Sequence, residues 1–413
     1  MTHESTIAGP SLADVERARV TVSAVADVTP MESSHYLSRV LGVPVFMKCE
    51  NLQRTGSYKI RGAYNRISSL SDEEKTRGVV AASAGNHAQG VAFAARELGI
   101  PATIFMPIGV ALPKLAATRD YGADVVLRGH TVAEPLRAAA EHAERTGAVY
   151  IPPFDHPYVI AGQGTLGLEV LEQVPDLATV IVPIGGGGLI SGMATVLKQR
   201  AAQLGREIRV IGVQAVTAAA YPVSLAAGAV TEITISPTIA DGIAVSKPGK
   251  LNFEIIKDTV DEVVTVDDDD IARAMLVLLE RAKLVVEPAG AVGVAAILTG
   301  KIRASGPTVV MLSGGNIDPL IMERVISHGL AASERYLKLR IPLPDRPGQL
   351  ARTSEIVAAQ NANVVEVLHT RHGTGLAISQ VELELHIETR GPEHAEQVLG
   401  ALRAEGYEPR VDF

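Results

Sequence analysis

The feature that most constrains the fold is a repeated succession of short apolar runs and longer segments with helical spacing. One stretch, "TVIVPIGGGGLISGMATVLKQRAAQLG" (179–205), has the pattern of a strand, a glycine turn and a helix. The other apolar runs are "VVAAS" (79–83), "PATIFMP" (101–107), "ADVVLRG" (123–129), "RVIGVQAV" (209–216) and "TVVMLSGGN" (308–316). Unbroken Val and Ile runs are typical of strands buried on both faces. Their alternation with helices predicts an α/β fold with a parallel, doubly wound sheet.

A different pattern begins near residue 333. "RYLKLRIPLP" (335–344) predicts a strand, which a helix and a second strand follow. "GLAISQVELELHIETR" (375–390) alternates strictly and predicts a long strand, before a further helix and a last strand. This βαββαβ order is the ferredoxin-like arrangement. We therefore place a domain boundary at Ala332 to Arg335.

Composition and charge restrict the compartment and the classes of partner that we expect for this protein. A net charge of -8 leaves no excess of basic residues for a nucleic-acid partner. The single cysteine, Cys49, allows no intrachain disulfide and fits a reducing compartment. The N-terminus lacks a signal-peptide pattern, and no apolar run reaches the length of a membrane span. These features predict a cytoplasmic protein with no membrane or nucleic-acid partner.

Four aspartates at 267–270 raise the question of a metal site. They stand directly before the helical pattern "IARAMLVLLERAKL" (271–284). Acidic residues at a helix start accept hydrogen bonds from unpaired N–H groups and suit the positive end of the helix dipole. Because carboxylates that bind metals usually converge from separate segments, we interpret the run as a helix start and predict no metal there.

Four consecutive glycines, 185–188, follow a predicted strand and open a predicted helix. Such a turn lets successive backbone N–H groups converge on one anion, although it also serves as a tight turn without any ligand. It matches neither the nucleotide-triphosphate loop nor G-x-G-x-x-G. The next strand carries Gln214 near its end instead of an acidic residue, so an NAD enzyme is the weaker alternative.

Two further turns follow predicted strands. "SAGNHAQG" (83–90) offers Ser83, Asn86 and backbone N–H groups, which suit a carboxylate ligand or, as the simpler alternative, a helix cap. "MLSGGN" (311–316) places Ser313 directly after its strand. Because ligands of open parallel sheets lie at the carboxyl ends of the strands, we expect all three turns to face one crevice.

The segment "GSYKIRGA" (56–63) places Lys59 between Tyr58 and Ile60. Most lysines are solvated. An amine among apolar and aromatic groups, however, has a lowered pKa and is a nucleophile toward aldehydes. Together with an anion cradle and a turn for a carboxylate, Lys59 predicts a phosphate-bearing aldehyde cofactor.

Four motifs, in this order, resemble those of one enzyme family. They are "ENLQRTGSYKIRGA", "SAGNHAQGVA", "PIGGGGL" and "LSGGN". Over about residues 15–325 the chain is similar to the threonine/serine dehydratase group of pyridoxal-phosphate enzymes. The resemblance implies pyridoxal 5'-phosphate as cofactor and the tryptophan-synthase-β-like fold (fold type II, two parallel-sheet subdomains). The catalytic domain would span 1–332, with its smaller subdomain at roughly 55–155.

The resemblance also implies roles for the residues that hold the cofactor. Lys59 matches the lysine that forms the Schiff base, and Asn86 matches the asparagine that bonds the pyridine 3′-oxygen. Ser313 matches the residue that faces the ring nitrogen, and Tyr58 is expected against the ring. The loop that holds the cofactor phosphate consists of Gly185, Gly186, Gly187, Gly188 and Leu189.

The implied substrate site is the turn at 83–87. Ser83 and the N–H groups of Gly85, Asn86 and His87 match the positions that bind the substrate carboxylate. Glu287, in "EPAGA", falls at a family position near the site and has no role assigned.

The implied reaction is the dehydration and deamination of L-threonine to 2-oxobutanoate and ammonia by β-elimination. The amine of Lys59 removes the Cα proton. A neutral hydroxyl such as that of Ser313 at the ring nitrogen favours rapid loss of the β-hydroxyl, which leaves as water with acid help from the cofactor phosphate. L-serine, which would give pyruvate, is the alternative substrate, because one methyl group is worth only roughly 1–3 kcal/mol of discrimination.

Two residues argue against a serine racemase. Ala84 stands where similar racemases have a serine that acts as the second base. Gln214 stands where related racemases bind a divalent ion through a glutamate, so the resemblance predicts no divalent metal, and a monovalent ion on backbone carbonyls stays open. A β-replacing synthase and a non-catalytic amino-acid sensor are the remaining alternatives, and the intact Lys59 counts against the sensor.

Residues 335–413, with "DRPGQLA" (345–351) after the first strand, resemble a single ACT domain, an amino-acid-sensing module. The resemblance implies an isoleucine or valine effector near this turn, between paired ACT domains, and allosteric control of an enzyme of isoleucine biosynthesis. It also implies a homo-oligomer, either a dimer or a homotetramer. The alternative is a dimerisation surface that binds no effector.

Overall fold

The computed structural model describes residues 9–131, 133–371 and 379–412. The chain divides into two compact units, Met1–Pro319 and Leu320–Phe413. This division falls at the start of helix α14 (Pro319–Ala332), whereas we predicted domain limits of 1–332 and 335–413. Those domain limits stay a prediction, and the two units are described separately.

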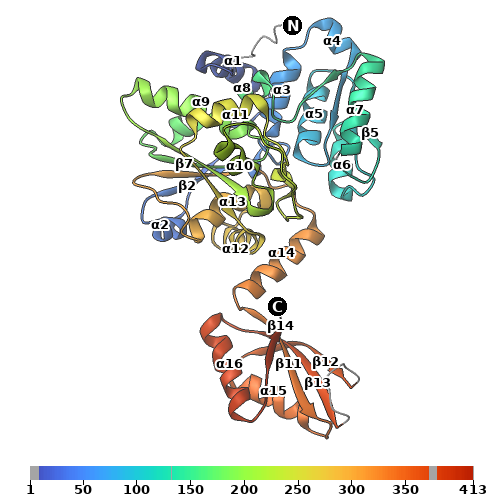
Figure 1. Cartoon of the computed structure of the whole chain (residues 1–413), viewed down its shortest axis with the longest axis vertical. Helices are drawn as coiled ribbons and strands as arrows, with labels where there is room; N and C mark the ends of the chain where they lie inside the picture. Colours follow the sequence, from blue (N-terminus) through green and yellow to red (C-terminus); the bar gives the residue numbers. More distant parts are fainter. Residues whose placement is uncertain (1–8, 132, 372–378, 413) are drawn as a thin grey trace. The chain divides into compact units, whose positions relative to one another are not determined.

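The larger sheet of the first unit has six strands in the order β1-β2-β10-β7-β8-β9 (Figure 1). They are β1 (Met31–Ser33), β2 (Val45–Cys49), β7 (Thr179–Pro183), β8 (Arg209–Ala215), β9 (Glu262–Val266) and β10 (Thr308–Leu312). All neighbouring strands are parallel except β1 and β2. The predicted parallel sheet is thus confirmed. The antiparallel edge strand β1 was not predicted, because its three partly exposed residues form no apolar run.

The smaller sheet has four parallel strands in the order β5-β4-β3-β6. They are β3 (Val79–Ala82), β4 (Ala102–Met106), β5 (Asp124–Leu127) and β6 (Val149–Tyr150). The first three coincide with predicted apolar runs. The two-residue strand β6 is too short to leave a pattern in the sequence.

Helices connect these strands. Those of the first unit are α1 (Leu12–Val22), α2 (His35–Leu41), α3 (Lys59–Ser68), α4 (Asp72–Arg77), α5 (Asn86–Glu97), α6 (Leu112–Asp120), α7 (Ala133–Thr146), α8 (Pro157–Gln173), α9 (Gly188–Gln203), α10 (Ala220–Ala227), α11 (Lys250–Thr259), α12 (Asp268–Val277) and α13 (Pro288–Leu298). Shorter helical turns are η1 (Glu50–Leu52), η2 (Val216–Ala218), η3 (Asp241–Ile243) and the π-helical η4 (Leu278–Ala282).

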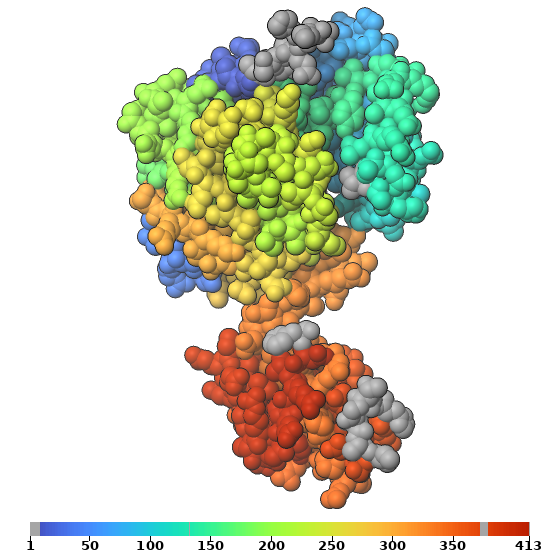
Figure 2. Space-filling model, viewed as in Figure 1, coloured from blue at the N-terminus to red at the C-terminus, as the bar shows by residue number. Residues whose placement is uncertain are grey.

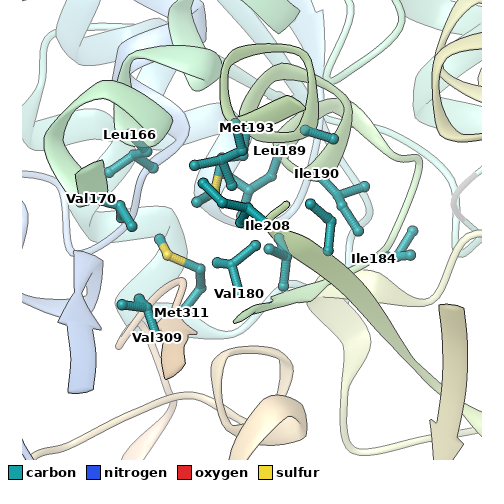
Figure 3. Packing of buried hydrophobic residues seen from close by; sticks show 14 of the residues in the cluster. Leu166, Val170, Val180, Ile184, Leu189, Ile190, Met193, Ile208, Val309 and Met311 are labelled. Atoms are coloured by element: carbon teal, nitrogen blue, oxygen red, sulfur yellow. The ribbon is translucent and has the colours of Figure 1, made fainter. Parts of the chain in front are cut away.

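The main core of the first unit lies between the larger sheet and helices α8 and α9 (Figure 3). Leu166 and Val170 of α8 and Met193 of α9 pack with Val180 of β7 and Val309 of β10, and all five are completely buried. Burying one such side chain is worth roughly 1.5–3 kcal/mol. This packing holds the start of α9, and therefore the glycine loop before it, at the edge of the sheet.

The four aspartates begin a helix, as predicted. Asp267 is the N-cap of α12, and its side chain accepts a hydrogen bond from the Asp270 N–H at 2.8 Å. The Asp268 carboxylate accepts bonds from the Thr238 hydroxyl at 2.6 Å and the Ile239 N–H at 3.0 Å. The α-helix is shorter than its pattern predicts, because it passes into the π-helical turn η4 after Val277.

The second unit continues from α14 with β11 (Tyr336–Pro344), α15 (Gln349–Ala359), β12 (Asn363–Thr370), β13 (Gln380–Glu388), α16 (Pro392–Ala404) and β14 (Arg410–Asp412). Its four strands form an antiparallel sheet in the order β12-β13-β11-β14. The order of elements is β, α, β, β, α, β. Residues 375–378, which open the long predicted strand, lie outside the described residues.

The surface of the first unit carries one long irregular segment. The residues between α10 and η3 are mostly exposed, and they form the yellow-green patch on the face shown in Figure 2. In the described ranges, no helix combines the length and the apolar character that crossing a membrane requires.

Candidate active site

The predicted site residues follow the carboxyl ends of strands in the two sheets of the first unit. Ser313 follows β10, the glycine loop follows β7, and Ser83 follows β3. The segment that leads to Lys59 is joined to the Ser313 segment by two contacts. The Tyr58 N–H donates to the Ser313 carbonyl at 3.2 Å, and Ser57 forms a β-bridge with Gly314. These two contacts place the Lys59 segment beside the end of β10, at the carboxyl edge of the larger sheet.

Lys59 is the first residue of α3, and its Nζ donates a hydrogen bond to the Pro153 carbonyl at 2.9 Å. The amine also lies 5.4 Å from the centre of the Tyr58 ring. Burial lowers the pKa of Lys59 to about 8, and the negative charge of Glu287 partly opposes this shift. A larger fraction of this amine is neutral near pH 7 than of a free lysine, as a nucleophile or a base requires.

Two residues after Lys59, a buried cluster of charges anchors α3. The Arg61 guanidinium donates to Glu50 at 2.8 Å and to Glu169 at 2.5 Å, and Lys48 lies 2.7 Å from Glu169. All four side chains are almost fully buried. Two cations and two anions balance one another there, which buried charges need in order to be tolerated. The cluster ties α3 to β2 and α8 and so fixes the position of Lys59.

The glycine loop has the properties of an anion site. Among the described residues, the backbone N–H groups from Gly185 to Leu189 donate no hydrogen bond to another part of the chain. A Cβ atom on Gly186 would lie 2.3 Å from the Phe154 ring, and one on Gly187, whose φ is +102°, would lie 2.1 Å from the Tyr221 hydroxyl. Glycine is therefore required at both positions, and the free N–H groups begin α9, where an anion is favoured.

One short segment connects Lys59 to this loop. Pro153 accepts the bond from Lys59, the next residue, Phe154, packs against Gly186 and Gly188, and Asp155 caps α11. The Asp155 carboxylate accepts from the N–H groups of Lys250, Leu251 and Asn252. This segment was not predicted from the sequence, because a proline-rich connection after a two-residue strand carries no recognisable motif.

The turn at 83–87 is more open than the glycine loop. Residues 83–86 are all half-buried, and α5 begins at Asn86 with Gly85 as its N-cap, so neither Ser83 nor Asn86 caps the helix. The Gly85 N–H donates to the Ser83 hydroxyl at 3.2 Å. The predicted Gly85 donor is therefore already paired, whereas the N–H groups of Asn86 and His87 find no acceptor among the described residues.

His87 is buried and bonds the Ile151 carbonyl through Nε2 at 2.8 Å. Since a carbonyl only accepts, Nε2 carries the proton of the neutral ring. Burial, together with the positive charge of Lys59, lowers the pKa of His87 to about 3. His87 is thus a neutral structural group at physiological pH, and its side chain carries no charge for a substrate carboxylate.

Asn86 is held from two sides. Its Nδ2 donates to Glu287 Oε1 at 2.7 Å, and its Oδ1 accepts from Asn316 Nδ2 at 2.8 Å. Asn316 Nδ2 also donates to the Thr55 carbonyl at 2.7 Å, which identifies this atom as nitrogen and therefore fixes the orientation of the Asn86 amide. Asn316 was not predicted as a site residue, although it is the last letter of the motif "LSGGN".

Glu287 is buried beside this amide, and burial, reinforced by the negative charge of Asp241, raises its pKa to about 7. Ser313 is also buried and directly follows the strand β10. Ala84 lies between Ser83 and Gly85 and offers no group that could exchange a proton.

The residues present fit the cofactor that the motifs imply. A pyridoxal phosphate needs an amine, an anion cradle and polar groups for its ring. Lys59, the unpaired N–H groups of the glycine loop, and Asn86 with Ser313 would supply these in turn. In the parts of the chain that the structure describes, no three His, Cys, Asp or Glu side chains gather as metal ligands do.

Comparison with known proteins identifies a matching family and similar proteins. The model of the family described as pyridoxal-phosphate dependent enzymes matches residues 22–314. The L-threonine ammonia-lyase of Thermotoga maritima is 48% identical over 402 residues, which cover 97% of this chain and 99% of that protein.

Two solved structures are also similar. Threonine deaminase isoform 2 of Solanum lycopersicum is 39% identical, with a TM-score of 0.71, over 78% of this chain and 94% of that chain. Maize serine racemase is 36% identical, with a TM-score of 0.73, over 78% of this chain and 98% of that chain. Neighbours that share this fold are thus named for different reactions, and the residues of the site must decide between them.

Proposed function

This chain belongs to the family of pyridoxal-phosphate dependent enzymes, and on that premise we propose that it is an L-threonine ammonia-lyase. It converts L-threonine to 2-oxobutanoate and ammonia. The bound cofactor supplies the electron-withdrawing ring that makes the Cα proton removable. The observation that carries this function is the position of the Lys59 amine. The amine donates a hydrogen bond to the Pro153 carbonyl, and the next residue, Phe154, packs against the glycine loop.

The proposed work of the protein is to bind, to orient and to move one proton. The N–H groups from Gly185 to Leu189 would hold the cofactor phosphate, and Asn86 and Ser313 would contact its ring. Lys59 Nζ takes the Cα proton, for which its pKa of about 8 is suited. The N–H groups of Asn86 and His87 at the start of α5 bind the substrate carboxylate.

Elimination rather than racemisation is supported by Ala84. Racemisation needs a proton donor and acceptor on each face of Cα, and Lys59 serves one face only. Because the methyl side chain of Ala84 carries no such group at the opposite turn, we assign this protein to the lyases. The similarity to the ammonia-lyase over 97% of the chain supports the same choice.

Steady-state kinetics test this function. L-threonine is expected to give equal amounts of 2-oxobutanoate and ammonia, L-serine is expected to react more slowly, and D-serine should not form from L-serine. A higher kcat/KM for L-serine than for L-threonine would mean that L-serine is the substrate. Formation of D-serine as the main reaction would mean that the protein is a racemase and not a lyase.

For the second unit we propose an ACT domain that binds an amino-acid effector, isoleucine or valine. A hollow of about 250 Å³ lies beside the turn between β11 and α15 and supports this proposal. It is lined by backbone and side chains of Leu343, Asp345, Arg346, Gly348, His369 and Arg371, among others. The charged groups suit the ends of a free amino acid, and Leu343 suits an aliphatic side chain.

Deletion of the residues after Ala332 tests the effector site. The shortened protein should keep its threonine turnover and lose any response to isoleucine or valine. An undiminished response in the shortened protein would contradict the proposal. The homo-oligomer stays a prediction, which light scattering of the full chain can measure.

A further inference from the structure

The carbonyl of Gly186, in the middle of the glycine loop, is held in one direction by hydrogen bonds. It accepts a bond from the Tyr221 hydroxyl at 2.9 Å and a second from the Gly249 N–H at 3.3 Å. In a trans peptide the C=O of one residue and the N–H of the next point in opposite directions. No cis peptide occurs in the described chain. The Gly187 N–H therefore points away from Tyr221.

Gln214 holds Tyr221 in place. Its Oε1 accepts the Tyr221 backbone N–H at 2.9 Å, and its Nε2 donates to the carbonyls of Ile184 and Ala218, both at 3.3 Å. The orientation of the amide is fixed, because an N–H can only donate and a carbonyl can only accept. Both Gln214 and Tyr221 are completely buried. Gln214 thereby connects the residue before the glycine loop to the first turn of α10.

The loop and the tyrosine also fit each other in shape. Gly187 has a left-handed φ of +102°, and any Cβ there would lie 2.1 Å from the Tyr221 hydroxyl. The segment that follows α10 is mostly exposed, and it lies on the face shown in Figure 2. Tyr221 also belongs to the main hydrophobic core, which is the reason a purely structural role must be tested separately.

We propose that Tyr221, held by Gln214, is a positioning residue that turns the Gly186–Gly187 peptide so that the Gly187 N–H faces the cofactor phosphate. The inference rests on the proposed function, since it needs a phosphate-bearing cofactor in this loop. An anion site built from backbone N–H groups depends on their being aimed before the ligand arrives. Tyr221 itself touches the loop from the side opposite to the aimed N–H.

The test compares pyridoxal 5'-phosphate with pyridoxal, which lacks the phosphate. The two compounds are titrated into the cofactor-free full chain, and binding is followed by absorbance. Tyr221→Phe removes only the hydroxyl, and we expect the Kd for pyridoxal 5'-phosphate to rise about tenfold, as loss of one hydrogen bond implies. The Kd for pyridoxal should change less than twofold, since no phosphate is there to contact the loop.

Two further variants complete the experiment. Gln214→Met removes the amide at similar volume and should weaken phosphate-dependent binding in the same direction. Tyr64→Phe is the matched control, because Tyr64 packs against the core of the smaller sheet and its hydroxyl makes no hydrogen bond among the described residues. That variant should bind both compounds as the wild type does.

Equal weakening of both compounds by Tyr221→Phe would show a general structural role and overturn the inference. Unchanged binding of both would overturn it as well. A wild-type protein that binds neither compound would instead contradict the proposed function, and the inference with it.

Discussion

The glycine loop at 185–189 and the turn at 83–87 have the same local structure, because each follows a parallel strand and begins a helix with unpaired N–H groups. They differ in their surroundings. The loop is walled by Phe154 and Tyr221 and is almost wholly buried, whereas residues 83–86 are all half-buried. A closed site suits a cofactor that stays bound, and an open one suits a substrate that is exchanged at each turnover. On this proposal the environment of such a turn, and not its local geometry alone, decides which ligand it holds.

The same substitution at the two turns gives the largest expected contrast. Gly186→Ala places a Cβ 2.3 Å from the Phe154 ring, whereas Gly85→Ala meets no atom within 4 Å. Overpacking costs about 1–3 kcal/mol. The Kd for pyridoxal 5'-phosphate should therefore rise roughly 10- to 100-fold in Gly186→Ala and stay nearly unchanged in Gly85→Ala.

Titration of the cofactor-free variants measures both values, and thermal unfolding confirms that each variant is folded. Equal losses of affinity in the two variants would remove the distinction between a closed cofactor site and an open substrate site.

A second change addresses the open turn. Ser83→Ala removes the acceptor of the Gly85 N–H, which lies at 3.2 Å. One such hydrogen bond is worth about 0.5–1.5 kcal/mol. The KM for L-threonine should rise about 2- to 10-fold while the cofactor Kd is unchanged. Ser23→Ala, at an exposed helix end, is the control. A rise in the cofactor Kd without a change in KM would mean that this turn serves the cofactor, and it would contradict its assignment to the substrate.

The pH dependence of cofactor capture follows from Lys59. Burial lowers its pKa to about 8, and only the neutral amine attacks an aldehyde. The amine is protonated below this pH and neutral above it, so the rate at which the cofactor-free protein takes up pyridoxal 5'-phosphate should rise through pH 8 and level off above it. Stopped-flow absorbance between pH 6 and 10 measures the rate. A rate that still rises steeply at pH 10 would mean a solvated amine.

Glu287→Gln should move this midpoint by the smallest amount. The charge of Glu287 raises the pKa of Lys59, so a neutral side chain should lower the midpoint, by less than about one pH unit. The Gln oxygen can still accept from Asn86, which keeps the amide in place. Glu254→Gln, at an exposed ion pair, is the control and should leave the midpoint unchanged. A shift to higher pH would contradict the assigned electrostatic effect.

The strands of the first unit could largely be predicted, because buried parallel strands form unbroken apolar runs. The runs at 79–83, 179–183 and 308–312 became β3, β7 and β10. Strands β1 and β6 were missed, since two or three residues contain no period to detect. Strands β2 (Val45–Cys49) and β9 (Glu262–Val266) were missed as well, because Lys48 in one and Glu262 and Thr265 in the other interrupt the apolar run. The helix start at Asp267 was correct because capping depends on local sequence alone.

For the candidate site, the sequence indicated the segments that carry its motifs. Lys59, Asn86 and Ser313 lie on segments that the structure joins by hydrogen bonds. Their roles stay predictions. Phe154, Tyr221 and Asn316 were missed, because each acts on a turn that is distant in sequence, and only the fold shows which segments meet.

The most direct test of the account is the absorbance and turnover of Lys59→Ala, purified in the presence of pyridoxal 5'-phosphate. The wild type is expected to show the absorbance band of a lysine-bound cofactor and to convert L-threonine to 2-oxobutanoate. In the variant both the band and the turnover should be absent, while the intact glycine loop still binds the cofactor through its phosphate. Turnover of L-threonine by Lys59→Ala at the wild-type rate would contradict the assignment of this amine and of the site built around it.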